Sequence, residues 1–297
     1  MDIIIYHNAD PDGNFSGAIA LKANPLAQTI GYNYEPEFGH IIEASRGKRV
    51  VMVDVSPKNW ADMHLLCEAA EEVTWIDHHA TALEQMKAYK TVESYPNFSA
   101  VFEHEKWGAA HATFQHFFPE VPVPLVVEMV AGYDVFRDYG TEKWTNYYFP
   151  FRFAVSKLNT PQKVLEHFHL DALGEPLLQQ FLERGRAVAE YIDDENRALV
   201  NNPKLVKDAV FFGGFRVLAV NRALFGDMFK SRDLSDYDFV VGYFHESDTW
   251  KVSMRGAGKG HDLGAIALEF GGGGHKDAAG FAVPTFAELK HILSGLE

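Results

Sequence analysis

Acidic and histidine residues gather at several places along this chain, with types and spacings that suit metal chemistry. Carboxylates and imidazoles together favour Mn²⁺, with Mg²⁺, Co²⁺ or Fe²⁺ as alternatives. Two such ions roughly 3.5–4 Å apart can activate a water and stabilise the attacking and leaving oxygens of a phosphoester. The clusters therefore predict a site that cleaves phosphoesters with two divalent cations. In chain order they are His7-Asn8-Ala9-Asp10-Pro11-Asp12-Gly13, Val53-Asp54-Val55-Ser56-Pro57, Asp77-His78-His79, Gly132-Tyr133-Asp134 and Gly271-Gly272-Gly273-Gly274-His275.

Each cluster also has a purely structural interpretation. Asp10-Pro11-Asp12-Gly13 is an ordinary turn signature. Asp54 could simply end a strand, and Asp134 could end a helix. The glycines from 271 to 274 could form only a flexible loop. The run Asp77–His79 is harder to explain in this way, because adjacent ionisable residues after an apolar strand need partners. The order and the combination of the clusters favour the functional interpretation.

The elements that must position these residues follow an alternating pattern in the first half of the chain. A strand-helix-strand-helix rhythm implies an α/β fold with a parallel sheet and helices on both faces. Ser56 is expected to cap the second helix, with Pro57 at its first position. The predicted strands and helices are, in order, Ile3–His7, Phe15–Ala23, Val50–Val55, Asn59–Ala70 and Val73–Ile76.

The acidic clusters follow the predicted strands directly. Asp10 and Asp12 come after the first strand, Asp54 ends a later one, and Asp77 ends the next. In parallel sheets, ligands bind in the crevice beyond the carboxyl ends of the strands. Separate strands are therefore expected to aim carboxylates at one crevice, and this convergence is the main physical argument for a site.

The chain is expected to form two domains. A long amphipathic stretch, Pro176–Val200, ends at the turn-like break Asn201-Asn202-Pro203-Lys204. We therefore predict an N-terminal domain with its connecting helix over residues 1–200 and a smaller α+β domain over residues 201–297. In the second domain the predicted strands and helix are 209–212, 216–220, 239–244, 250–254, 262–269 (the helix) and 280–283.

The charge and composition of the chain limit the kinds of molecule that it is expected to bind. The 297 residues carry a formal net charge of −14, from 27 Lys and Arg against 41 Asp and Glu. A surface so negative opposes long nucleic acid, whose binding needs many cationic contacts to phosphates, but a short anionic substrate needs only a few. The apolar runs are too short to span a membrane, the first residues do not form a signal peptide, and the single cysteine, Cys67, fits a reducing cytoplasm. A cytoplasmic protein is expected, and a homodimer is possible.

In their order and in their residue types, these motifs resemble those of the DHH phosphoesterase superfamily, specifically of members with a DHH-associated C-terminal domain. The resemblance spans nearly the whole chain and rests on the literal Asp77-His78-His79 and on Gly272–Gly280, which reads Gly-Gly-Gly-His-x-x-Ala-Ala-Gly. It is similar to the oligoribonuclease and phosphoadenosine-phosphate phosphatase type. The resemblance implies an active site in the cleft between the domains.

The same resemblance implies a metal-dependent hydrolase that uses two divalent cations, with Mn²⁺ favoured. Its expected reaction is the hydrolysis of short oligonucleotides or dinucleotides to mononucleotides. The alternative within enzymes is a phosphatase of 3′-phosphoadenosine 5′-phosphate or a related small phosphoester. The alternative from another class is a catalytically inactive nucleotide-binding regulator.

Roles for single residues also follow from the resemblance. Asp77 would orient the metal ligands from outside, and His79 would face the substrate phosphate or support the metal cluster. The residues implied to bind one cation are His7, Asp10 and Asp54. Those implied to bind the other are Asp12, Asp54, His78 and Asp134, so that Asp54 bridges. The residues implied to contact substrate from the second domain are Arg255, Gly272, Gly273, Gly274 and His275.

Two points remain open in the sequence. Many relatives read His-x-x-Pro-Asp-x-Asp, whereas this chain places Pro11 between Asp10 and Asp12. The ligand pair is therefore either Asp10 with Asp12, which we prefer because it keeps two carboxylates, or Asp12 with Asn14. The aromatic stretch 144–153 could stack bases, although core packing is the preferred interpretation.

Overall fold

The computed structural model describes residues 2–89, 92–102, 106–171, 176–224 and 228–295. The chain divides into two compact units, Met1–Ala189 and Glu190–Glu297. The division falls within the long helix α9 (Leu178–Val200). The domain boundary that we predict between residues 200 and 201 coincides with the end of this helix and stays a prediction.

The first unit contains a fully parallel sheet, as the alternating pattern predicts. Its order is β2-β1-β3-β4-β5, so the first strand lies inside the sheet. β1 has the predicted bounds, and the strands that carry the later acidic clusters differ from prediction by only one or two residues. The strands are β1 (Ile3–His7), β2 (Gln28–Tyr32), β3 (Arg49–Val53), β4 (Glu72–Asp77) and β5 (Phe98–Phe102).

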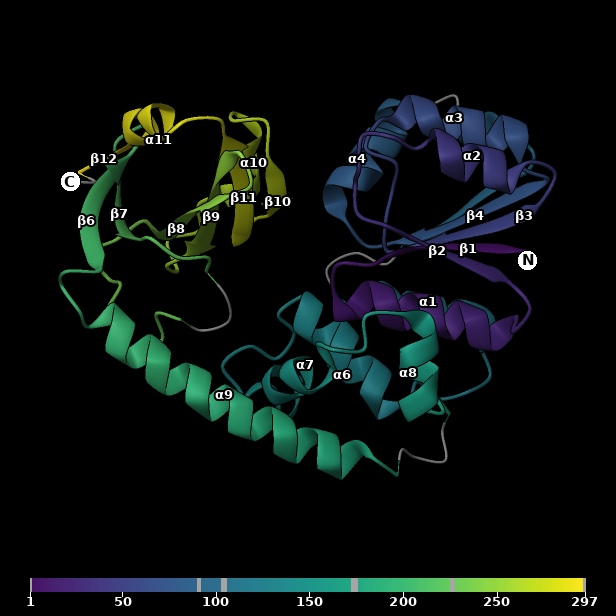
Figure 1. Cartoon of the computed structure of the whole chain (residues 1–297), viewed down its shortest axis with the longest axis horizontal. Coiled ribbons are helices and arrows are strands. Elements are labelled where there is room, and N and C mark those ends of the chain that lie inside the picture. Colours follow the sequence, from purple (N-terminus) through teal and green to yellow (C-terminus); the bar gives the residue numbers. More distant parts are fainter. Residues whose placement is uncertain (1, 90–91, 103–105, 172–175, 225–227, 296–297) are drawn as a thin grey trace. The chain divides into compact units, whose positions relative to one another are not determined.

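Helices cover both faces of this sheet, because the side chains of its strands alternate between two apolar cores. Ile3 and Ile5 pack with residues of the helices on one face, whereas Ile4 and Tyr6 pack toward α1 on the other. Figure 1 shows α2 and α3 on one side of the strands and α1 on the opposite side. The helices whose side chains join these two cores include α1 (Pro11–Ala23), α2 (Gly39–Ser45), α3 (Trp60–Ala69) and α4 (Ala80–Ala88).

Further helices pack against α1 and complete the first unit. Trp144, Phe149 and Phe151 are almost fully buried in this helical core, so core packing is the correct interpretation for most of the aromatic stretch. The remaining elements are the 3₁₀ turn η1 (Val92–Ser94), α5 (Ala109–Phe117), α6 (Leu125–Asp134), the π-helical turn η2 (Trp144–Tyr148), α7 (Phe149–Val155) and α8 (Pro161–His167).

The second unit has the predicted α+β character. Its seven-stranded mixed sheet has the order β10-β11-β9-β8-β7-β6-β12, and α10 and α11 contribute to its core. Asp262 caps α10 through a hydrogen bond from the Ala265 N–H. The elements are β6 (Val206–Phe211), β7 (Phe215–Val220), β8 (Phe239–Glu246), β9 (Thr249–Gly256), α10 (Leu263–Leu268), β10 (Gly273–His275), β11 (Ala278–Val283), α11 (Phe286–Ile292) and β12 (Leu293–Ser294).

One predicted helix start is wrong. Ser56 and Pro57 do not begin α3; the helix begins at Trp60, and its cap is Asn59, whose side chain accepts a hydrogen bond from the Ala61 N–H. The polar cap nearer to the helix prevails, because its oxygen reaches the unpaired N–H groups of the first turn. Within the described residues, no helix combines the length and the apolar character needed to cross a bilayer.

Candidate metal centre

The end of β1 and the start of α1 bring the first cluster together. Asp10 caps α1, and its Oδ1 accepts a hydrogen bond from the Gly13 N–H at 3.0 Å, while Pro11 occupies the first helical position. A Cβ on Gly13 would lie 2.1 Å from the His7 carbonyl oxygen, so only glycine allows this close turn. As a result, Nδ1 of His7 lies 2.9 Å from Oδ2 of Asp10.

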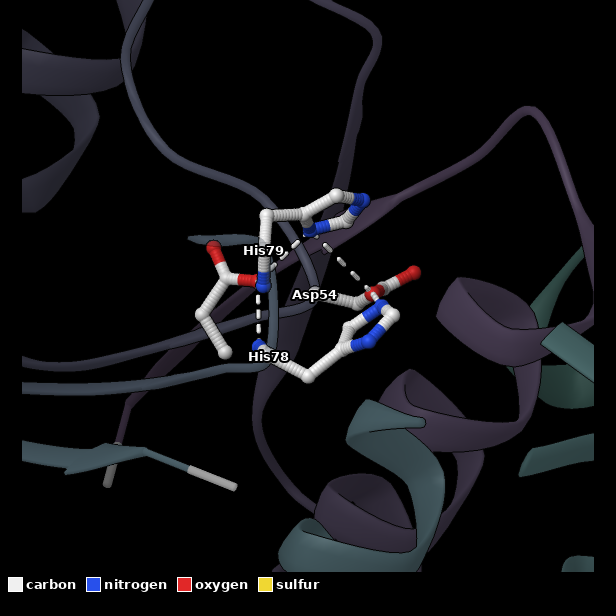
Figure 2. Close-up of side chains that lie close together, drawn as sticks. Asp54, His78 and His79 are labelled. Carbon is white, nitrogen blue, oxygen red and sulfur yellow. Dashed lines mark hydrogen bonds and ion pairs between the residues drawn. The ribbon is translucent and has the colours of Figure 1, made fainter. Parts of the chain in front are cut away.

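Asp54 follows β3 directly and lies at the middle of the cluster. Its φ of +60° is in the left-handed region, which is uncommon outside glycine. The two carboxylate oxygens face different histidines: Oδ2 lies 3.5 Å from Nδ1 of His7, and Oδ1 lies 3.3 Å from Nε2 of His78. In Figure 2 the rings of His78 and His79 lie on the carboxylate side of Asp54.

Asp77 fixes the turn that follows β4. Its Oδ1 accepts hydrogen bonds from the backbone N–H groups of His78 and His79, at 2.7 and 3.1 Å, and lies 2.7 Å from Nδ1 of His79. Asp77 is fully buried, and these contacts replace the hydration of its Oδ1. The bond to Nδ1 leaves Nε2 of His79 on the far side of its ring, directed away from Asp54 (Figure 2).

Two helix ends bring in the remaining carboxylates. Asp134 is the last residue of α6, and its Oδ2 lies 3.2 Å from Nε2 of His78. Asp12, in the first turn of α1, is held by the N-terminus of α5, where Ala109 N–H and Ala110 N–H donate to its two oxygens at 2.6 and 3.2 Å. A helix N-terminus stabilises a carboxylate through these free N–H groups and the helix dipole.

The arrangement fits divalent cations. Oδ1 of Asp54 and Nδ1 of His7 are buried and make no hydrogen bond of good geometry with the residues that the structure describes, although both face charged neighbours. Buried polar atoms without such partners are costly unless another group satisfies them. Sets of possible ligand atoms lie within 4.8 Å of one another in three groups: His7, Asp10 and Asp54; Asp12, His78 and Asp134; and Asp54, Asp77, His78 and His79.

The electrostatics show a centre with too much negative charge. Burial, together with the charges of Asp54 and Asp134, raises the pKa of Asp12 well above its usual value. Burial alone would lower the pKa of His7, but its contacts with Asp10 and Asp54 outweigh burial and raise it to about 11. Carboxylates and imidazoles crowded in this way suit divalent cations, whose charge would favour the ionised carboxylates.

The structure separates Asn14 from the two carboxylates of the first cluster by their contacts. Asp10 and Asp12 both lie in groups of ligand atoms. Asn14 is buried in α1, and its Nδ2 donates to the carbonyl oxygen of Asp10, so this side chain serves the first turn of the helix. The metal-binding roles themselves stay predictions.

The sequence alone did not reveal two supports of the centre. Asn33, just after β2, lies with its Oδ1 3.2 Å from Nε2 of His7, which leaves Nδ1 of His7 to face the carboxylates. Such outer contacts fix the orientation of a metal-binding imidazole. If β2 is recognised as a strand, Asn33 becomes a candidate, because it lies beyond the carboxyl end of a parallel strand. The contact of α5 with Asp12 joins distant parts of the chain and leaves no signal in the local sequence.

The predicted substrate-contacting residues of the second unit lie on neighbouring strands. Ala278 of β11 pairs with His275 of β10 on one side and with Arg255 of β9 on the other. Directly paired residues project to the same face of a sheet, so His275 and Arg255 flank Ala278, about 9–10 Å apart at the backbone.

The glycines of this loop have different reasons to be glycine. A Cβ on Gly272 would lie 2.1 Å from the Gly280 carbonyl oxygen, and one on Gly274 would lie 2.5 Å from that of Ala278. Gly273 has open space around it among the described residues. Packing therefore explains two of the three glycines, and the substrate-binding role of the loop stays a prediction.

Comparison with known proteins gives a domain match and a fold match. Residues 227–297 match the DHHA1 domain. An uncharacterized protein of Acanthamoeba polyphaga mimivirus is 26% identical over 317 residues, covering 99% of this chain and 69% of that protein.

Three solved structures share the fold at low identity. The pGpG-specific phosphodiesterase PggH of Vibrio cholerae has a TM-score of 0.53 and 13% identity, with 98% of this chain and 96% of that one covered. An exopolyphosphatase-related protein of Bacteroides fragilis has a TM-score of 0.53 and 12% identity, with 98% of this chain and 89% of that one covered. RecJ of Thermus thermophilus, in complex with Mn²⁺, has a TM-score of 0.52 and 20% identity. The match covers 95% of this chain but only 49% of RecJ.

The fold and the site define the class: a two-unit α/β protein with a candidate metal centre at the carboxyl end of a parallel sheet. The match of residues 227–297 to the DHHA1 domain and the fold shared with these three structures agree with the resemblance drawn from the motifs.

Proposed function

We propose that the protein is a two-metal phosphodiesterase that hydrolyses short oligonucleotides or dinucleotides to mononucleotides. The observation that carries the proposal is the sharing of Asp54 between two groups of ligand atoms, one with His7 and Asp10 and one with Asp77, His78 and His79. His78 also belongs to a third group, with Asp12 and Asp134. The name of one structural neighbour, a pGpG-specific phosphodiesterase, supports phosphodiester chemistry. The acidic chain, with net charge −14, supports a short substrate.

The proposal assigns two cation sites to the N-terminal unit. Mn²⁺ is the proposed ion, because the donors mix nitrogen and oxygen and because the RecJ neighbour is a Mn²⁺ complex. Bound there, such cations would neutralise phosphoryl charge and make a water nucleophilic. One site would be held by His7, Asp10 and Asp54, and the other by Asp12, Asp54, His78 and Asp134.

The remaining proposed roles belong to residues near the substrate. Asp77 holds Nδ1 of His79 and so fixes the orientation of its ring, and the proposal gives His79 a contact with the substrate phosphate or a supporting role for the metal cluster. Arg255 and His275 would bind substrate phosphates, and the backbone N–H groups of the glycine loop would assist them. A cytoplasmic location and a nucleotide ligand, without long nucleic acid or membrane as partner, complete the proposal.

The test compares purified wild-type protein with His78→Ala in Mn²⁺. The substrates are dinucleotides of varied sequence, longer oligomers, 3′-phosphoadenosine 5′-phosphate and pyrophosphate. We expect the wild-type protein to hydrolyse the dinucleotides rapidly. His78→Ala should react at least about 100-fold more slowly, because even residues that only orient metal ligands change metal affinity or activity by about 10–100-fold. His40→Ala, at an exposed histidine of α2, is the matched control.

Other outcomes would favour the alternatives. A preference for 3′-phosphoadenosine 5′-phosphate would identify a nucleotide phosphatase. Tight nucleotide binding without turnover of any substrate would identify a regulator. Full activity of His78→Ala would contradict the site assignment.

A further inference from the structure

Tyr34 has a strained backbone at the same edge of the sheet as the metal centre. It lies two residues beyond the paired position of Tyr32 and His7, where β2 and β1 end side by side. Its φ is +56°, which is an outlier for a bulky aromatic residue. Backbones of this kind persist only where their surroundings impose them, and they concentrate at sites that bind ligands.

The surroundings of Tyr34 impose this conformation through both of its neighbours. The Tyr32 hydroxyl donates to the carbonyl oxygen of Glu35 at 2.8 Å, and the Asn33 N–H donates to the Glu35 carboxylate at 2.8 Å. Asn33 is in turn fixed to Nε2 of His7. The loop that presents Tyr34 is therefore tied directly to a proposed metal ligand.

The Tyr34 ring lies against that ligand. Its centroid is 5.6 Å from that of His7, with the two rings edge to face at 64°. A phenol keeps its proton at neutral pH, so the Tyr34 hydroxyl can donate a hydrogen bond. The Tyr34 side chain makes no hydrogen bond with the other residues that the structure describes.

We propose that Tyr34 is a substrate-contacting residue, whose hydroxyl donates a hydrogen bond to an anionic oxygen of the phosphoryl group hydrolysed at the metal centre. This inference rests on the proposed function. Ionised carboxylates can only accept hydrogen bonds, so the cluster itself offers a phosphoryl oxygen few donors. A phenol supplies a donor without changing the charge on which cation binding depends, and a strained loop holds it in place before the substrate arrives.

The test is Tyr34→Phe, which keeps the ring against His7 and removes only the hydroxyl. We expect kcat/KM for dinucleotides to fall about 10- to 100-fold, the worth of one hydrogen bond to a charged group. We also expect inorganic phosphate to bind the Mn²⁺-loaded protein about 10-fold more weakly, as measured by calorimetry. The Mn²⁺ affinity and the Tm should stay at wild-type values, since a structural role would change them first. Tyr89→Phe, at a tyrosine 44% exposed, is the matched control.

Two results would overturn the inference. One is a Tyr34→Phe protein with wild-type kcat/KM and phosphate affinity. The other is a loss of Mn²⁺ affinity that accounts for the loss of activity, which would make Tyr34 a positioning residue for His7. A wild-type protein that binds phosphate through Tyr34 but hydrolyses no phosphoester would instead contradict the proposed function and support the contact.

Discussion

Asp54 combines a left-handed backbone with a carboxylate that faces both proposed cation sites. A non-glycine residue in this region costs about 1–3 kcal/mol, which the surrounding packing must offset. We expect Asp54→Asn to fold, because asparagine tolerates the left-handed region, and to lose at least about 100-fold in Mn²⁺-dependent activity and Mn²⁺ affinity. Calorimetry and hydrolysis assays measure both, and a variant with wild-type Mn²⁺ affinity would contradict the bridging role.

The ionisation of His7 predicts how the metal-free protein responds to pH. The pKa of His7 is about 11, above its ordinary value of 6.5, so its contribution to stability is fully present below pH 6.5 and is lost as pH rises toward 11. The raised pKa values of Asp10 and Asp12 act in the same direction, because ionising carboxylates that lie beside Asp54 is unfavourable.

We therefore expect the Tm in EDTA to fall as pH rises from 6.5 to about 9. In excess Mn²⁺ the fall should be offset, because cations bind the deprotonated ligands and compete better at higher pH. Thermal unfolding across this range, with His7→Asn as the variant that flattens the metal-free profile, measures the effect. A metal-free Tm that rises with pH would refute this account of the electrostatics.

At the residue scale, much of the centre could be predicted from sequence. Acidic residues that directly follow apolar strands are predicted to lie close together, because the carboxyl ends of parallel strands meet at one edge of the sheet. Asn33 and Tyr34 were missed, since β2 reads Gln-Thr-Ile-Gly-Tyr and lacks the apolar run that made β1 recognisable.

At the scale of elements, the N-terminus of α5 positions Asp12. The approach is so close that a Cβ on Gly108 would lie 2.6 Å from Oδ2 of Asp12. We expect Gly108→Ala to destabilise the protein by about 1–3 kcal/mol through overpacking and to weaken Mn²⁺ binding about 10-fold by displacing the carboxylate.

Gly39→Ala is the matched control, because Gly39 also lies at a helix start and a Cβ there would meet nothing within 4 Å. Thermal unfolding and Mn²⁺ titration of the two variants separate the effects. Equal Mn²⁺ affinities for Gly108→Ala and Gly39→Ala would contradict a positioning role for α5.

The elements themselves were predicted unevenly, for physical reasons. Strands buried on both faces, such as Ile3–His7, read as continuous apolar runs and are easily recognised. Helix starts depend on which of several polar residues reaches the free N–H groups, and the predicted cap, Ser56, is wrong because Asn59 caps α3. The short helices α2 and α11, of seven residues each, are too brief for a clear periodic pattern.

At the scale of the whole molecule, the net charge of −14 predicts weak binding of long oligonucleotides. Activity should decline as oligonucleotides lengthen, because each added phosphate brings repulsion without a new cationic contact. For dinucleotides, the logarithm of kcat/KM should fall against the logarithm of salt concentration with a slope of about −1 to −1.5, as expected for two phosphate contacts. Rates that rise with chain length would show that a long strand is bound.

In the proposed reaction, two divalent cations at this centre drive phosphodiester hydrolysis. The most direct measurement is a Mn²⁺ titration of metal-free protein, followed by calorimetry and, in the same samples, by hydrolysis of a dinucleotide. We predict two bound Mn²⁺ per chain and activity that appears only as both sites fill. A folded protein that binds no Mn²⁺, or one that hydrolyses the dinucleotide equally well in EDTA, would contradict the claim.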